Sequence, residues 1–66
     1  DGLLVRNGVF HPLEIKKTVS PDKNDIRHFA TLERLGLSVG QGAVICLCRE
    51  SLPLTETVCT VPAGWL

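Results

Sequence analysis

The sequence predicts a small α/β domain built on a mixed β-sheet. Three observations lead to this prediction: an Asn-Gly pair at positions 7 and 8, a Ser-Pro-Asp helix start at positions 20–22, and an unbroken apolar run at positions 43–48. A strand, a helix and a second strand in this order form a βαβ unit, in which the strands are parallel and the crossover is right-handed. The chain has 66 residues, so we expect a single domain, residues 1–66, near the size at which domains are marginally stable alone.

The Asn7-Gly8 pair predicts a tight hairpin. Both residues tolerate the positive φ angles of a type I′ turn, and alternating segments flank them. We therefore expect strands over residues 3–6 and 9–17, with Leu3 opposite Pro12. This alignment suits the proline, because it places Pro12 at a non-hydrogen-bonded pair, where its missing N–H is not needed.

The same alignment gathers charged residues at the open end of the hairpin. Asp1 falls opposite Glu14, and Lys16 projects from the same sheet face two residues further on. Two carboxylates that face each other are unfavourable unless a cation or a proton lies between them. The sequence therefore predicts a metal site at this position.

The next segment carries the signals of one helix. Ser20 can cap the helix, Pro21 suits its first position, and Asp22 favours the positive end of its dipole. The apolar spacing extends to Leu35, and Gly36 is a left-handed stop. We therefore expect a helix over residues 21–35. Its apolar face comprises Ile26, Phe29, Ala30, Leu32 and Leu35, and its solvated basic side comprises Lys23, Arg27 and Arg34.

The strand that carries Glu14 alternates apolar and charged residues. We expect the helix to pack on the face of Leu13 and Ile15, which leaves the face of Glu14 and Lys16 open to solvent or to another cover. Leu3, Val5 and Phe10 also belong to that second face. Because this apolar surface is large, we expect a further helix or a partner subunit to cover part of it.

Two more strands complete the predicted sheet. The run at 43–48 lacks alternation, which indicates a strand buried on both faces. Residues 57–61 are more polar and suit an edge strand, after a loop that contains Pro53. We expect the strand order to follow the chain, from the first hairpin strand through Glu14 and Val44 to Val58, with Trp65 packed back on the sheet.

The amino-acid composition argues against some classes of function. The formal net charge is zero, so the basic balance typical of nucleic-acid-binding domains is absent. No apolar stretch approaches the roughly 20 residues of a membrane span, and we expect no membrane partner. The chain begins inside an expected strand and without Met, so we expect it to be a fragment of a longer protein.

Three cysteines, Cys46, Cys48 and Cys59, lack the spacing of a disulfide framework and suit reduced thiols in the cytoplasm. Together with His11 or His28 they offer zinc ligands, but no Cys-x-x-Cys pair is present. We therefore interpret them as small buried hydrophobes.

The residue types at the hairpin permit metal-dependent phosphodiester chemistry. Asp1, Glu14 and the backbone carbonyl of Ile15 are the hard oxygen ligands that Mg²⁺ and Mn²⁺ prefer. Such an ion polarises a phosphoryl oxygen and activates water. Lys16 can stabilise the developing negative charge, so Asp1, Glu14 and Lys16 are the candidate catalytic residues. The competing interpretation is a surface ion pair, which contributes only about 0–1 kcal/mol.

Asp1, a hairpin, Glu14-Ile15-Lys16, a helix and a buried strand together resemble the PD-(D/E)xK nuclease core. More narrowly, the segment from His11 to Cys48 resembles the C-terminal domain of unknown function of prokaryotic AAA-type ATPases. The resemblance implies a truncated restriction-endonuclease-like fold, with Asp1 and Glu14 as metal ligands and Lys16 as the charge-stabilising group. The nuclease core opens with a helix and a strand that are absent before Asp1, so we expect this fragment alone to be inactive.

The resemblance also implies the setting of the domain. ATP would bind only in an upstream ATPase domain, because the glycines from Gly36 to Gly42 lack the Gly-Lys-Ser/Thr ending of a phosphate loop. The expected partners are DNA or RNA, the ATPase domain itself, or a second copy of the chain. The expected function is nucleic-acid engagement with divalent-metal cleavage of phosphodiesters. The alternative is a non-catalytic interaction or regulatory module of the ATPase, because fold does not establish function.

Overall fold

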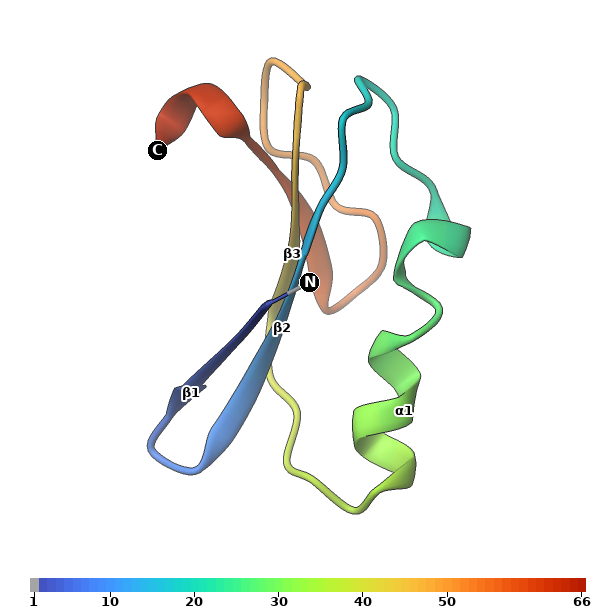
Figure 1. Ribbon diagram of the computed structural model, residues 1–66, viewed down its shortest axis with the longest axis vertical. Helices are drawn as coiled ribbons and strands as arrows, with labels where there is room; N and C mark the ends of the chain where they lie inside the picture. Colours follow the sequence, from blue (N-terminus) through green and yellow to red (C-terminus); the bar gives the residue numbers. More distant parts are fainter. Residues whose placement is uncertain (1) are drawn as a thin grey trace.

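The computed structural model describes residues 2–66. Its sheet contains four strands in the order β1-β2-β3-β4. The β1–β2 pair is antiparallel, whereas β2–β3 and β3–β4 are parallel (Figure 1). The predicted mixed α/β sheet and its strand order are therefore confirmed. The bounds are β1 Gly2–Arg6, β2 Val9–Ile15, β3 Gly42–Cys46, β4 Val58–Pro62, the α-helix α1 Phe29–Arg34 and the 3₁₀ turns η1 Lys23–Ile26 and η2 Ala63–Trp65.

The hairpin forms as the sequence predicts. Asn7 and Gly8 have φ angles of 53° and 78°, the positive values that the two-residue turn requires. The register runs from Arg6 opposite Val9 to Gly2 opposite Leu13, with Leu3 opposite Pro12. The expected alignment is thus confirmed for the described residues, and the expected pairing of Asp1 lies outside them.

The predicted single helix is wrong over residues 21–35. The segment forms η1 and then α1, separated by two residues. The cap is also different, because Asp22 replaces Ser20 as the first capping residue. The Asn24 N–H donates to Asp22 Oδ1 at 2.9 Å, and the Asp22 N–H donates to Asp25 Oδ2 at 2.9 Å, a reciprocal box that favours a start at Lys23.

The end of the helical segment agrees with the prediction. Gly36 has a φ angle of 79°, which a residue with a Cβ adopts only with strain. Its N–H donates to the Glu33 carbonyl at 2.9 Å, and the Leu37 N–H donates to the Leu32 carbonyl at 3.2 Å. These bonds close the last turn and lead the chain back toward the sheet.

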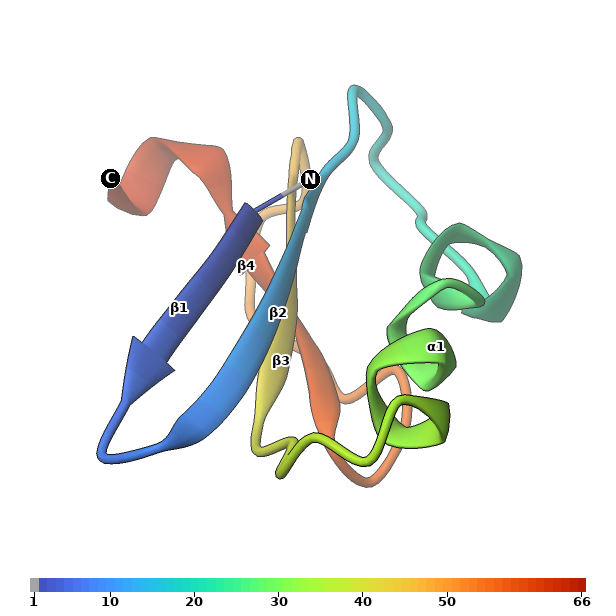
Figure 2. The same cartoon turned by 60° about the horizontal axis from the view of Figure 1, so that its bottom comes forward.

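The helical segment covers the opposite sheet face from the one predicted. Ile26 and Phe29 are buried against Val44, Cys46 and Val58, and Figure 2 shows α1 on one side of the sheet. On β2 the buried residues are Pro12 and Glu14, whereas Ile15 is 69% exposed. The physical reason is the apolar content of that face. Burial of Pro12, Val44 and Val58 there is favourable, and this gain exceeds the cost of burying the Glu14 carboxylate.

The other sheet face is only partly covered. We call it the open face. Its apolar members alternate with the buried residues along β2, β3 and β4, and Leu4 of β1 joins them through its pairing with His11: Leu4, Leu13, Ile15, Ala43, Ile45, Cys59 and Val61. The prediction that β3 is buried on both faces is therefore wrong, because Ala43 and Ile45 are only half-buried. The packing predicted for Trp65 is also wrong, since this residue is 64% exposed.

None of the helices in residues 2–66 has the length and apolarity needed to cross a lipid bilayer.

Candidate functional site

Glu14 lies near the end of β2 on the face that the helical segment covers. Its residue exposure is 6%, and it is one of the two buried polar residues among those described. Oε1 of Glu14 lies 3.1 Å from Nε2 of His28. His28 immediately precedes α1, and its ring meets Phe29 edge-on at a centroid distance of 4.8 Å. The Phe29 contact helps to hold the imidazole over the strand.

Lys16 directly follows β2 and belongs to the same face as Glu14. Its N–H donates to the Ile45 carbonyl at 2.9 Å, which extends the parallel ladder by one bond. Its ammonium Nζ lies 3.7 Å from Asp25 Oδ1, and the two side chains are 42% and 26% exposed. Because solvent reaches this pair, its contribution to stability is small. The lysine therefore remains accessible to an anionic group.

Of the other two predicted site residues, only Ile15 lies within the described part of the chain. The side chain of Ile15 belongs to the open face, and its proposed role rests on its backbone carbonyl alone. The role predicted for Asp1 lies outside the described residues. The structure thus brings Glu14 and Lys16 together on one face and adds two side chains from the helical segment.

Those two added residues, Asp25 and His28, are the ones that the sequence reasoning missed. They are three positions apart, so a helical segment presents both on one side. The signal was the apolar content of the Glu14 face, carried by Pro12, Val44 and Val58. That content indicates that the crossover covers this face, and a crossover there brings its polar residues to Glu14.

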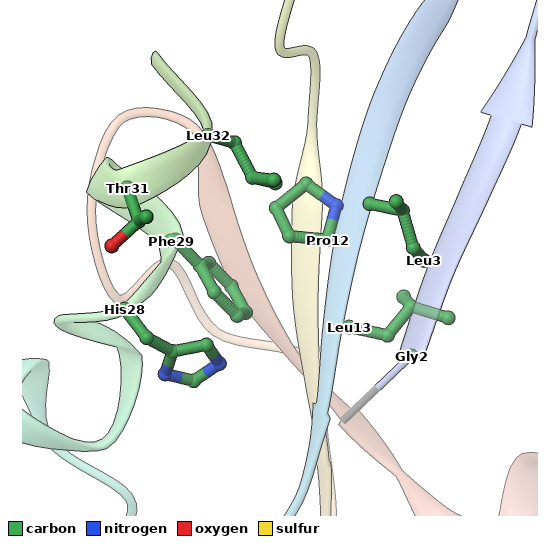
Figure 3. A pocket seen from close by; sticks show the side chains of 8 residues that line it. All are labelled: Gly2, Leu3, Pro12, Leu13, His28, Phe29, Thr31 and Leu32. Carbon is green, nitrogen blue, oxygen red and sulfur yellow. The ribbon is translucent and has the colours of Figure 1, made fainter. Parts of the chain in front are cut away.

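A groove runs between α1 and the hairpin beside this cluster. It has a volume of about 530 Å³, and Figure 3 shows its lining. Its lining residues are Gly2, Leu3, Pro12, Leu13, His28, Phe29, Thr31 and Leu32. The lining is mostly apolar, and it includes His28, which also contacts Glu14. The groove suits an apolar ligand or side chain better than a phosphate.

No family model, curated protein or solved structure matches this chain.

The described residues supply only part of a divalent-metal site. Within residues 2–66, no group of three or more His, Cys, Asp or Glu side chains is placed to hold an ion. Glu14 and His28 offer one carboxylate and one imidazole, and Asp25 is engaged with Lys16. The buried carboxylate is the hard donor that Mg²⁺ and Mn²⁺ prefer. A metal site here needs Asp1, as the sequence predicts, or water to complete the ligand set.

Proposed function

We propose that this chain is the C-terminal nuclease-like module of a AAA-type ATPase, and that Glu14 and Lys16 form its phosphodiester site together with Asp1. The family assignment rests on the sequence resemblance from His11 to Cys48. The order of an antiparallel hairpin, a helical crossover and a parallel strand is in keeping with a truncated restriction-endonuclease-like core. ATP binding belongs to the ATPase domain outside these residues.

The observation that carries the proposal is the burial of Glu14 on the sheet face to which Lys16 also belongs. A carboxylate that is 6% exposed lies among apolar neighbours, although an uncharged side chain there would avoid the desolvation penalty. Buried ionisable groups with specific charged partners concentrate at functional sites. The burial of the Glu14 carboxylate supports a chemical role for this residue in addition to packing.

The residues would divide the work as follows. Asp1, Glu14 and the Ile15 carbonyl would hold Mg²⁺ or Mn²⁺, which supplies Lewis-acid polarisation of a phosphoryl oxygen. Lys16, which is accessible to solvent, would bind the phosphate and stabilise its developing negative charge. His28 would orient the Glu14 carboxylate from the opposite side. Three free thiols suit the reducing cytoplasm as the compartment.

Metal binding can be tested on the 66-residue chain by titration with Mn²⁺ and observation of its amide NMR signals. We expect paramagnetic broadening of the signals from residues 13–16 and 28, and loss of that broadening in Glu14→Gln. The matched control is Glu33→Gln, because Glu33 is an exposed carboxylate on α1. Broadening that is unchanged in Glu14→Gln, or absent near β2, overturns the metal site.

Cleavage is tested separately with end-labelled single-stranded DNA and RNA in the longer ATPase that contains this module. We expect Lys16→Ala to keep Mn²⁺ binding and to lose cleavage, because the lysine acts on the phosphate and not on the ion. Lys17→Ala is the matched control, since Lys17 is an exposed neighbour. Cleavage that persists in Lys16→Ala contradicts the role of this residue.

The open face favours a second candidate, a non-catalytic module that docks on its own ATPase domain. Leu4 and Ile15 are 60% and 69% exposed on this face, and apolar patches of this kind mark protein interfaces. We expect Ile15→Lys to abolish binding of the chain to the separately produced ATPase domain in calorimetry. Lys17→Ala, which changes an exposed polar residue, should bind normally. Equal binding by the Ile15 variant rules out docking through this face.

A further inference from the structure

Two cysteine thiols approach each other where β3 ends. The Cys46 thiol donates a hydrogen bond to Cys48 Sγ, and the two sulfur atoms lie 2.9 Å apart. Residues two apart in a regular strand are separated by roughly 6.6 Å along the chain. Here β3 ends at Cys46 and the backbone bends at Leu47. The bend turns both thiols toward the same point.

We propose that Cys46 and Cys48 are a dithiol modification site, which a low-molecular-weight disulfide oxidises to an intramolecular disulfide. A disulfide bond is about 2.05 Å long. The two sulfur atoms therefore need to close by less than about 1 Å to reach bonding distance. This site is independent of the proposed phosphodiester chemistry, and its test does not depend on nuclease activity.

The environments of the two thiols assign them different roles. Cys48 is half-buried and lines two surface hollows, one formed with Arg49 and Leu52 and the other with Pro21 and Leu54. Cys46 is 1% exposed and belongs to the core. A small disulfide can therefore reach Cys48 but not Cys46. Burial also raises the pKa of the Cys46 thiol, and the neighbouring Cys48 thiol raises it further.

The exchange takes place in two displacements. In the first, the Cys48 thiolate attacks one sulfur of the small disulfide, forms a mixed disulfide and releases one small thiolate. In the second, the Cys46 sulfur attacks Cys48 Sγ and expels the second small thiolate, which takes up the proton that the Cys46 thiol loses. The two cysteine thiols are oxidised by two electrons, and the small disulfide is reduced to two thiols.

The third cysteine provides an internal control. Cys59 pairs with Ala43 and therefore belongs to the open face, whereas Cys46 belongs to the covered face with Val44. The sheet separates Cys59 from the other two thiols. Cys59 can exchange with a small disulfide, but it has no partner thiol within its own face among the described residues.

The test uses the reduced 66-residue chain in buffers of oxidised and reduced glutathione, with alkylation of the remaining thiols and mass spectrometry. Cleavage after Arg34 and Arg49 gives one peptide that contains both Cys46 and Cys48. We expect this peptide to lose two hydrogens and to resist alkylation, while Cys59 carries glutathione or the alkyl group. Cys59→Ser should oxidise to the same extent, and Cys48→Ser should lose the oxidised form completely.

Two results would overturn the proposal. One is a stable mixed disulfide between Cys48 and glutathione, which shows that Cys46 does not complete the exchange. The other is full alkylation of Cys46 and Cys48 under conditions in which Cys59 has already reacted. The wild-type peptide alone decides between these outcomes, so the test does not depend on the folding of either variant.

Discussion

Nε2 of His28 lies 3.1 Å from Oε1 of Glu14, and this contact joins the helical segment to a buried residue of β2. The imidazole is about half exposed, whereas the carboxylate is almost fully buried. The contact therefore connects a solvent-accessible ring to a charge in the core. It gives the crossover a polar contact with the sheet in addition to the apolar packing of Ile26 and Phe29.

The first prediction concerns this contact. His28→Ala removes the imidazole beside a buried carboxylate. We expect the unfolding free energy to fall by about 1 kcal/mol. The loss is no larger because solvent around the half-exposed imidazole weakens its contact with Glu14. Urea unfolding followed by circular dichroism measures the change. Lys23→Ala, an exposed change on η1, is the control. Equal stability of the two variants would show that the contact contributes nothing.

The second prediction concerns the turn. Gly8 has a φ angle of 78°, and we expect Gly8→Ala to lower the unfolding free energy by about 1 kcal/mol, because a Cβ disfavours this conformation. Gly64→Ala is a matched control, since a Cβ at Gly64 meets no atom within 4 Å and its φ angle is not in the strained range. The midpoint of urea unfolding measures the stability of both variants. A Gly64 variant as unstable as the Gly8 variant contradicts the strain argument.

The third prediction concerns the close packing of β3 under α1. A Cβ at Gly42 would lie 2.9 Å from the Pro12 carbonyl oxygen and 3.2 Å from the Phe29 ring. We expect Gly42→Ala to cost about 2 kcal/mol, because the nearest atom belongs to the backbone and cannot rotate away. Thermal unfolding measures the loss, and Gly64→Ala again provides the reference. A neutral Gly42 variant would show that β2 and β3 separate easily.

The fourth prediction is a pH dependence at Cys46. Burial and the Cys48 thiol raise its pKa above the ordinary value of 9.0. The folded chain therefore keeps this proton at a pH where the unfolded chain has lost it, and stability falls as pH rises through that window. Cys46→Val removes the titrating group and should lose less stability between neutral pH and about pH 10. Urea unfolding in the presence of a reductant measures the unfolding free energy of the wild type and of Cys46→Val at each pH. An equal loss of stability in the two proteins would contradict the prediction.

Local chemistry made much of the fold predictable. Asn7 and Gly8 adopt positive φ angles because their own sterics allow it, and the two-residue turn then fixes the register that pairs Leu3 with Pro12. Gly36 ends the helical segment for the same local reason. These features depend on residues that are close in the sequence, so the amino-acid sequence is enough to predict them.

The candidate site was only partly predictable. The period of two residues in a strand places Glu14 and Lys16 on one face, whatever packs on it. Their partners Asp25 and His28 depend on which face the crossover covers, and the charge alternation of β2 pointed to the wrong one. The alternation within one strand shows that the two faces of the sheet differ. It does not include the apolar residues that the other strands contribute to each face.

The sequence by itself determined the hairpin, its register, the strand order and the shared face of Glu14 and Lys16, because turn sterics and strand periodicity act within a few residues. Only the tertiary structure decided that the crossover covers Glu14, that it divides into η1 and α1, and that Cys46 and Cys48 converge. The covered face follows from burial of Val44, Val58 and Phe29 in one core, and burial sums contributions from segments far apart in the chain.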